Sequence, residues 1–476
     1  MHEDLTATEV VGAIARGELT ALAYLTSVLE RAAERADLGV VVALDPDGAR
    51  TAAAAIDAAR ASGAPLGPLA GLPLLVKDNI NTAALPTTGG TPALRDVRPT
   101  SDAEVLARLV AAGAIVVGKS TMHELAFGVT TTNLAPGAAI ARNPYDTSRI
   151  PGGSSGGTAA AIAARIVPAG LGTDTGASVR VPAAFSGIVG LRPSTGGGRR
   201  RYSGAGVLPL SHTLDTVGPL GRTVRDVALL DAVVTDGPVP AAVELAGLRI
   251  GTPAVLWNDL ERPVAAVMHE ARRRLAEAGV VLVDADMPEA LALAEKIVFP
   301  LALHEPRDDI PAYLRETGIE GITLETIAAG IASPDVRGAF GAVTADAFGD
   351  AYPDAIAVHR PRLQQTYAAY IAEHHLDAIL FPTSPVLPAP IDAVNGSGTL
   401  TVDGGPPVDT FTTTIRTVGP GSCAGVPSLS LPAGRTPAGL PVGLNLEGPV
   451  DGDTALLAIG MAVETLLGSL PAPPGR

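Results

Sequence analysis

Short apolar runs separated by longer stretches of helical periodicity are the feature that most restricts the fold of this chain. The runs are "LPLLV" at 72–76, "AIVVG" at 114–118 and "AILF" at 378–381. Continuous apolar runs of this length are typical of buried strands. Because they alternate with helical patterns, the sequence predicts an α/β protein, in which layers of helices surround a largely buried sheet.

The chain contains no linker, repeat or charge block that divides it cleanly into domains, and residues 238–247 are the best candidate seam. We therefore expect a single domain over residues 1–476. Thr6 and Glu9 stand at capping-box spacing, which predicts a first helix within an N-terminal helical region at 1–60. The Ala-rich stretch at 285–360 is interpreted as a helical insertion or lid on that domain.

Composition limits the partners and the compartment. The 476 residues are 47% apolar and 17% charged, which indicates a globular chain, and the formal net charge is −15. Nucleic acid and anionic membranes both require a basic surface, so neither is expected as a partner. Cys423 is the one cysteine and no apolar run reaches membrane-spanning length. The start "MHEDLTATEVV" lacks the pattern of a secretion signal, so a cytoplasmic location is expected.

Lys77 is unusual because the chain uses arginine for nearly all its positive charge. Only three of the 34 basic residues are lysines, and Lys77 ends an apolar run in "GLPLLVKDNI". A desolvated lysine can lose its proton and act as a base, whereas arginine cannot. The alternative is a lysine that reaches from a strand end to pair with Asp78.

The segment "PGGSSGGTAAAIAAR" at 151–165 is a Gly/Ser loop that runs into an Ala-rich helix. It contains G-x-S-x-G around Ser154, the pattern of a nucleophile elbow. That reading needs a histidine partner, and His359, His374 and His375 are available in charged, helical surroundings. A flexible or anion-binding loop is the other interpretation.

The stretch "GTDTGASVR" at 172–180 surrounds Ser178 with residues almost too small to pack. Small residues allow another group to approach the backbone closely. Together with "KDN" and "GGSSGG", this stretch resembles the signature of the amidase signature family of serine hydrolases. "GAIVVGKSTMHELAFG", "RNPYDTSRIPGGSSGG", "LDTVGPLGRTVRDVALL" and "GVPSLSLPAGRTPAGLPVGLNL" extend the resemblance over most of the chain, and about 240–360 match weakly. It implies a large mixed β-sheet covered by helices on both faces.

The resemblance also implies a Ser/cis-Ser/Lys triad. Ser178 matches the nucleophile, Ser154 the bridging serine of the cis peptide bond and Lys77 the base, and Ser155 supports the lysine and the loop. The implied oxyanion hole consists of the N–H groups of Thr175, Gly176, Ala177 and Ser178. Asp174 and Arg180 match positions that brace this loop, although a purely structural ion pair explains them equally well. Phe127 and Gly128 match pocket positions, and Phe127 can equally belong to the core.

Ala177 departs from the family pattern, which has a second glycine there. If the position requires positive φ, alanine would be strained by about 1 kcal/mol or more. Its methyl group would also narrow the pocket.

The motifs look most like the indoleacetamide and mandelamide hydrolase branch, which implies cleavage of a small, aryl-substituted primary amide to acid and ammonia. The same acyl-enzyme would serve esters, carbamates or linear amide oligomers. A glutaminase-type subunit of an amidotransferase is disfavoured because that branch usually has Gln where this chain has Val181. A catalytically silent binding protein is the remaining alternative. No cofactor is implied, the eight histidines show no metal-ligand spacing, and a homodimer is possible.

Overall fold

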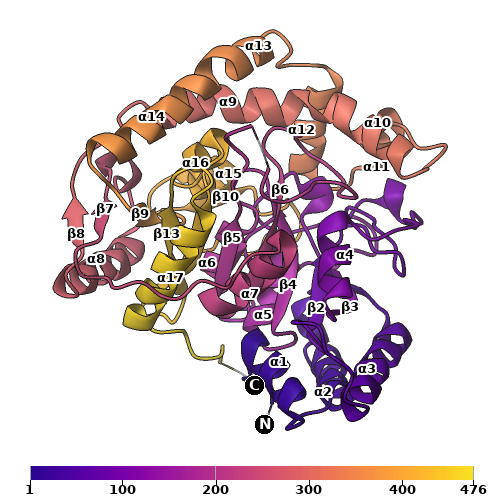
Figure 1. The fold of residues 1–476 in the computed structure, drawn as a ribbon. Helices are drawn as coiled ribbons and strands as arrows, with labels where there is room; N and C mark the ends of the chain where they lie inside the picture. The colour runs from indigo at the N-terminus through magenta and orange to yellow at the C-terminus, as the bar shows by residue number, and fades with distance from the viewer. Residues whose placement is uncertain (1, 199, 475–476) are drawn as a thin grey trace.

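The three apolar runs are strands of one large sheet in the computed structural model, which describes residues 2–198 and 200–474 (Figure 1). They form β2 (Pro73–Lys77), β3 (Ile115–Ser120) and β9 (Ala378–Pro382). The sheet has 11 strands in the order β1-β3-β2-β4-β6-β5-β12-β13-β9-β7-β8. The other strands are β1 (Val41–Leu44), β4 (Ala169–Asp174), β5 (Val189–Arg192), β6 (Thr216–Gly221), β7 (Arg249–Gly251), β8 (Val281–Val283), β12 (Ser428–Arg435) and β13 (Pro441–Glu447), while β10 (Thr399–Thr401) and β11 (Pro407–Asp409) form a separate pair.

The sheet is mixed, as expected. Strand β2 runs parallel to both β3 and β4, whereas β12 runs antiparallel to both β5 and β13. Strands β12 and β13 come from the last tenth of the chain but lie between β5 and β9, inside the sheet.

Helices cover both faces because side chains of successive strand residues point in opposite directions. In β2, Leu75 packs with the N-terminal helices and α5, whereas Leu74 and Val76 pack with α4 and α7 on the other face. The helices of the two faces and the N-terminal region are α1 (Ala7–Arg16), α2 (Ala21–Glu34), α3 (Pro46–Ala61), α4 (Glu104–Ala111), α5 (Gly156–Ala163), α6 (Arg180–Phe185), α7 (Val224–Thr235), α8 (Arg262–Glu277), α14 (Arg360–Glu373), α15 (Thr410–Ile415), α16 (Gly419–Ala424) and α17 (Asp453–Leu467).

The N-terminal 60 residues are helical with one exception. Helix α1 begins with the expected capping box, in which the Thr6 side chain accepts from Glu9 N–H and the Glu9 carboxylate accepts from Thr6 N–H. Strand β1, which the sequence analysis did not predict, pairs with β3 and forms one edge of the sheet. It belongs to the apolar run "VVVAL" at 40–44, which was overlooked, and its alternate residues Val42 and Leu44 are exposed at the edge of the sheet.

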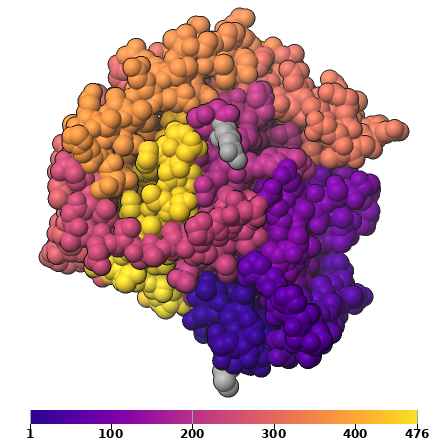
Figure 2. Space-filling view, viewed as in Figure 1, coloured from indigo at the N-terminus to yellow at the C-terminus, as the bar shows by residue number. Residues whose placement is uncertain are grey.

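Residues 285–360 are helical, and their helices arch over one end of the sheet (Figure 1). In the space-filling view they form a continuous orange and salmon rim above the C-terminal segment (Figure 2). The rim consists of α9 (Ala290–His304), α10 (Pro306–Glu316), α11 (Leu324–Gly330), α12 (Pro334–Thr344) and α13 (Tyr352–Asp354), followed by a π-helical turn at Ala355–His359. Among the described residues, no helix combines the length and apolar character needed to cross a membrane.

Candidate active site

The three sequence motifs meet at the carboxyl ends of β2 and β4. These neighbouring strands are parallel, with Val76 paired to Leu171, so Lys77 and Thr173 end up beside each other. The Gly/Ser loop leads into α5, which packs on β2 and β4. Three segments that are distant in sequence therefore present polar groups at one sheet edge, where ligand sites of α/β proteins commonly form.

Lys77 is completely buried and bonded to the Gly/Ser loop. Its Nζ lies 2.7 Å from Ser154 Oγ, 2.7 Å from Thr173 Oγ1 and 3.3 Å from the Thr173 carbonyl oxygen. Burial lowers the pKa of Lys77 from its ordinary 10.5 to about 7, against the opposing charges of Asp174 and Asp215. The neutral amine is therefore populated near neutral pH.

The alternative partner for Lys77, Asp78, is engaged elsewhere. Its carboxylate lies 3.7 Å from Nζ of Lys119, a second fully buried lysine, and accepts a hydrogen bond from the Thr88 hydroxyl. Adjacent strand residues point to opposite faces, so Lys77 and Asp78 diverge. The pairing of Lys77 with Asp78 is therefore wrong.

Ser154 and Ser155 connect the lysine to the loop that carries Ser178. The Gly153–Ser154 peptide bond is cis, as the family resemblance implied. Ser155 N–H donates to the Ser178 carbonyl oxygen at 3.1 Å, and Ser155 Oγ donates to the Thr173 carbonyl oxygen at 3.2 Å. The histidines required by a nucleophile elbow, His359, His374 and His375, do not line the cavity beside Ser178.

Glycines in the 172–178 loop serve two different purposes. A Cβ atom on Gly172 would lie 2.6 Å from Ser155 Oγ, so the glycine makes room for the serine. A Cβ on Gly176 would meet no atom within 4 Å, because this residue lines the cavity. Over the described chain, the N–H groups of Gly176, Ala177 and Ser178 donate to no protein acceptor.

Ala177 is not strained in the way the sequence analysis considered. It is absent from the described non-glycine residues that have positive φ, so its backbone is one that alanine adopts freely. Its methyl group is buried in the core beside the cavity.

Asp174 and Arg180 form a buried ion pair beneath this loop. Arg180 Nε lies 3.0 Å from Asp174 Oδ2, and Arg192 Nη1 lies 3.1 Å from Asp174 Oδ1. Burial by itself raises the pKa of Asp174, but the two guanidinium groups outweigh it and hold that pKa well below its usual range. Arg180 Nη2 and Ser422 Oγ both donate to the Gly176 carbonyl oxygen, at 3.0 and 2.9 Å, and thereby orient the loop.

Sequence reasoning missed Arg192, and it missed Ser422 although that residue lies three positions before the quoted segment that begins at Gly425. It also missed Asp215, whose Oδ1 accepts from the Thr175 hydroxyl at 2.6 Å. Asp215 Oδ2 accepts from the N–H groups of Leu210 and Ser211. No spacing rule connects these residues, because only the folded sheet brings them together.

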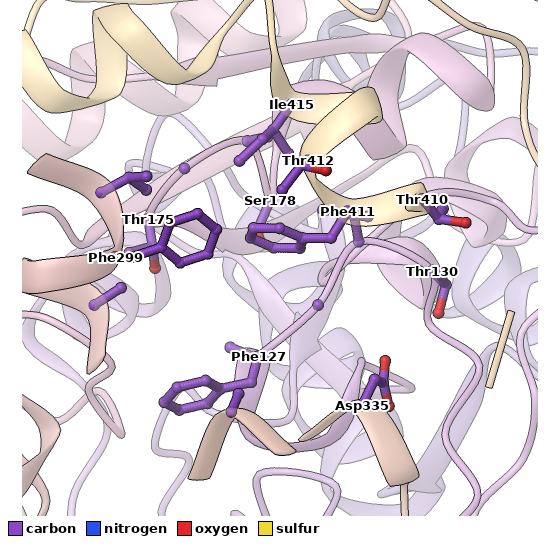
Figure 3. Close-up of a pocket in the computed structure, with 18 of the residues that line it drawn as sticks. Phe127, Thr130, Thr175, Ser178, Phe299, Asp335, Thr410, Phe411, Thr412 and Ile415 are labelled. Atoms are coloured by element: carbon purple, nitrogen blue, oxygen red, sulfur yellow. The ribbon is translucent and has the colours of Figure 1, made fainter. Parts of the chain in front are cut away.

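A cavity of about 520 Å³ opens beside Ser178, Thr175, Gly176 and Ala177. Phe127 and Gly128 line it, as the resemblance implied. The rest of its wall is mainly apolar, and seven of its residues come from α9 and α12, within the weakly matching region 240–360. Figure 3 shows Phe299 and Phe411 beside Ser178, with Phe127 and Asp335 across the cavity from them. Its volume falls within the range of small-molecule sites.

One cluster has the composition of a metal site. Single ligand atoms of His212, Glu305 and Asp309 lie within 4.8 Å of one another, which the sequence spacing did not suggest. Both Glu305 oxygens already accept hydrogen bonds, from Ser211, Thr213 and Tyr352. Asp309 accepts from the His212 backbone and ring, so hydrogen bonding accounts for the cluster.

Comparisons with known proteins agree with this geometry. A family model described as Amidase matches residues 23–457. The chain is 40% identical over 487 residues to the mandelamide hydrolase of Pseudomonas putida, which covers 99% of this chain and 93% of that protein. It is 41% identical over 458 residues to an indoleacetamide hydrolase of Rhizobium radiobacter, with 95% of each covered. A solved amidase structure superposes with a TM-score of 0.85 at 33% identity, covering 98% of this chain and 100% of the other. The chain therefore belongs to the amidase signature family of amide C–N hydrolases.

Proposed function

We propose that this protein hydrolyses a small, aryl-substituted primary amide to a carboxylic acid and ammonia, with Ser178 as the nucleophile. The observation that carries the proposal is Lys77, which is buried, has a pKa of about 7 and contacts Ser154 Oγ at 2.7 Å at the edge of the cavity that Ser178 lines. The mandelamide and indoleacetamide hydrolases, by their names, cleave amides of this class.

Ser154 relays protons between Ser178 and Lys77. The Ser178 proton passes to Ser154, and the Ser154 proton passes to neutral Lys77 as Ser178 Oγ bonds to the amide carbon. The N–H groups of Gly176, Ala177 and Ser178 stabilise the oxyanion, with Thr175 as the fourth member of the hole. The same relay returns the proton to the nitrogen as the C–N bond breaks, which releases ammonia. Water then attacks the acyl-enzyme, and the relay takes its proton and returns it to Ser178 as the acid leaves.

The lining of the cavity favours an aryl group over glutamine. Among the described residues around it, no lysine or arginine is present to pair with the α-carboxylate of free glutamine. Three phenylalanines supply flat apolar surface instead: Phe127, Phe299 and Phe411. This lining supports a stand-alone hydrolase over a glutaminase-type subunit.

Residues 285–360 act as the cover of this cavity within a single domain. Helix α9 contributes Val298, Phe299, Ala302 and Leu303, and α12 contributes Asp335, Gly338 and Ala339. Self-association as a homodimer and a cytoplasmic location stay predictions.

The test is ammonia release by the purified protein from phenylacetamide, mandelamide, indole-3-acetamide, acetamide and glutamine, with Ser178→Ala as the control. We expect release from the aryl amides that is abolished in the control. Phe299→Ala should raise KM for phenylacetamide more than for acetamide. Release from glutamine alone, or aryl-amide turnover that persists in Ser178→Ala, would overturn the proposal.

A further inference from the structure

Asp335 places a carboxylate in the wall of a mainly apolar cavity. Its side chain is 31% exposed, and in Figure 3 it lies on the side of the cavity with Phe127, across from Phe299 and Phe411. The one other charged residue among the described residues around the cavity is Asp409, which is exposed and accepts from Thr412 N–H and Oγ1. A carboxylate among apolar groups is unfavourable unless partners compensate for its lost hydration.

The position of Asp335 is fixed by the start of α12. The N–H groups of Ala332 and Ser333 donate to the Glu124 carboxylate, and Ser333 Oγ accepts from Leu134 N–H. Further along α12, Phe340 packs edge-to-face on Phe127 at 5.4 Å between ring centroids. The carboxylate therefore stands on a fixed helix end, which is the property of a built recognition group.

His123 stands behind Asp335 and is fully buried. Its Nε2 lies 3.0 Å from Asp335 Oδ2, and its Nδ1 lies 3.2 Å from Thr130 Oγ1. A Cβ atom on Gly128 would approach this ring to 2.3 Å, so glycine at 128 is what allows the histidine to occupy its place. The imidazole therefore occupies the space between Gly128 and the Asp335 carboxylate.

These partners leave Asp335 with unused acceptor capacity. A carboxylate offers about four lone-pair sites. Val336 N–H donates to Oδ1 at 3.0 Å, whereas His123 Nε2 approaches Oδ2 without the geometry of a hydrogen bond. Burial alone raises the pKa of Asp335, but His123 outweighs it and holds that pKa below its ordinary value, so the group is ionised. Because the Val336 N–H and the N-terminus of α12 already offset the negative charge, and the surrounding wall is mainly apolar, the remaining acceptor sites suit a neutral donor.

We propose that Asp335, held by His123, accepts a hydrogen bond from the end of the substrate distal to the amide, so that the enzyme prefers aryl amides whose ring bears an O–H or N–H group. The inference rests on the proposed function and specifies its substrate class. In the absence of a donor, binding would strip water from the carboxylate without replacing its hydrogen bond, so the unsubstituted ring is disfavoured.

The experiment compares kcat/KM for phenylacetamide, its three ring-hydroxylated isomers and the matching methoxy compounds. We expect at least one hydroxylated isomer to exceed both phenylacetamide and its methoxy counterpart by about 10- to 100-fold in the wild type, the range of a hydrogen bond to a charged acceptor. In Asp335→Ala the ratio of kcat/KM between hydroxylated and unsubstituted rings should fall to about one, whatever the absolute rate for phenylacetamide. Asp409→Asn is the matched control and should keep the preference.

Each outcome decides a separate point. Equal kcat/KM values for hydroxylated and unsubstituted rings in the wild type would overturn the inference. A preference for the hydroxylated ring that survives in Asp335→Ala would overturn it as well. A phenylacetamide whose ring bears an aminomethyl group should have a lower kcat/KM than the best hydroxylated isomer. A higher value would show that the preferred donor is a cation, which would also overturn the inference. No turnover of phenylacetamide by the wild type would instead refute the proposed function, so the two failures are distinguishable.

Discussion

The protonation of Lys77 should set the pH dependence of the enzyme. With a pKa of about 7 in place of its ordinary 10.5, half of the lysine is neutral at pH 7. An unperturbed lysine would be neutral in roughly one molecule in 3,000 at that pH. Burial therefore raises the concentration of the active base about 1,500-fold. The corresponding free-energy difference is about 5 kcal/mol at 1.36 kcal/mol per pH unit.

The assay is kcat/KM for an aryl amide between pH 5 and 9, which reports ionisations of the free enzyme. Because the base must be neutral, the rate should fall on the acid side, with half-maximum near pH 7 and about a tenfold decrease per unit below pH 6. Lys77→Ala should lower the rate by several orders of magnitude with the fold intact.

A second group must be separated from Lys77 in this assay. Burial raises the pKa of Glu447 to about 7, and Glu447 Oε1 lies 3.8 Å from Arg180 Nη1, beneath the oxyanion loop. Glu447→Gln removes this ionisation and leaves Lys77 in place. The acid limb should persist in that variant, whatever its absolute rate. A profile that is flat down to pH 5, or an acid limb that disappears in Glu447→Gln, would refute the assignment of Lys77 as the base.

Four further outcomes follow from the site. Lys77→Met should raise the free energy of unfolding at pH 7, as measured by urea denaturation, because a buried lysine that binds its proton more weakly in the folded state destabilises the protein. The free energy of unfolding of the wild type should rise with pH between about 7 and 10.5, so the advantage of the variant should shrink over that range. Asp174→Asn should destabilise by about 3–5 kcal/mol, because it leaves Arg180 and Arg192 buried without their carboxylate; a loss below 1 kcal/mol in the same denaturation experiment would contradict this. Gly172→Ala should lower kcat and also lower the free energy of unfolding by about 1–3 kcal/mol, because its Cβ would lie 2.6 Å from Ser155 Oγ. Wild-type values of both quantities would disprove the clash. Ala177→Gly should leave kcat within severalfold and reduce stability by only about 0.4–1 kcal/mol, because Ala177 has no positive φ to relieve; a large gain in activity would show that the methyl group obstructs the substrate.

The sequence predicted those parts of the molecule whose signal is local or belongs to a motif. The buried runs became β2, β3 and β9, and the mixed sheet with helices on both faces is confirmed. The triad and oxyanion-hole assignments came from the family motifs, and their catalytic roles stay predictions. Ala177 illustrates the limit of motif reasoning, because the departure from the family glycine suggested a strain that the backbone does not contain.

The distal part of the cavity could not be predicted from the sequence for a physical reason. Phe299, Asp335 and Phe411 belong to three separate elements, and their proximity depends on how the helices of the rim pack over the sheet. No periodicity or spacing encodes that packing. His123 and Lys119 were passed over for a related reason, since a titratable residue in a strand or loop reveals its burial only once the surrounding layers are in place.

The position of β12 and β13 has a consequence for protein synthesis. These two strands join β5 to β9, and Ser422, just before them, holds the Gly176 carbonyl oxygen. The two halves of the sheet therefore cannot join until β12 and β13 have left the ribosome. A nascent chain exposes Lys77, Ser154 and Ser178 well before Ser422 can hold the Gly176 carbonyl oxygen, so the oxyanion loop receives its last support late in synthesis.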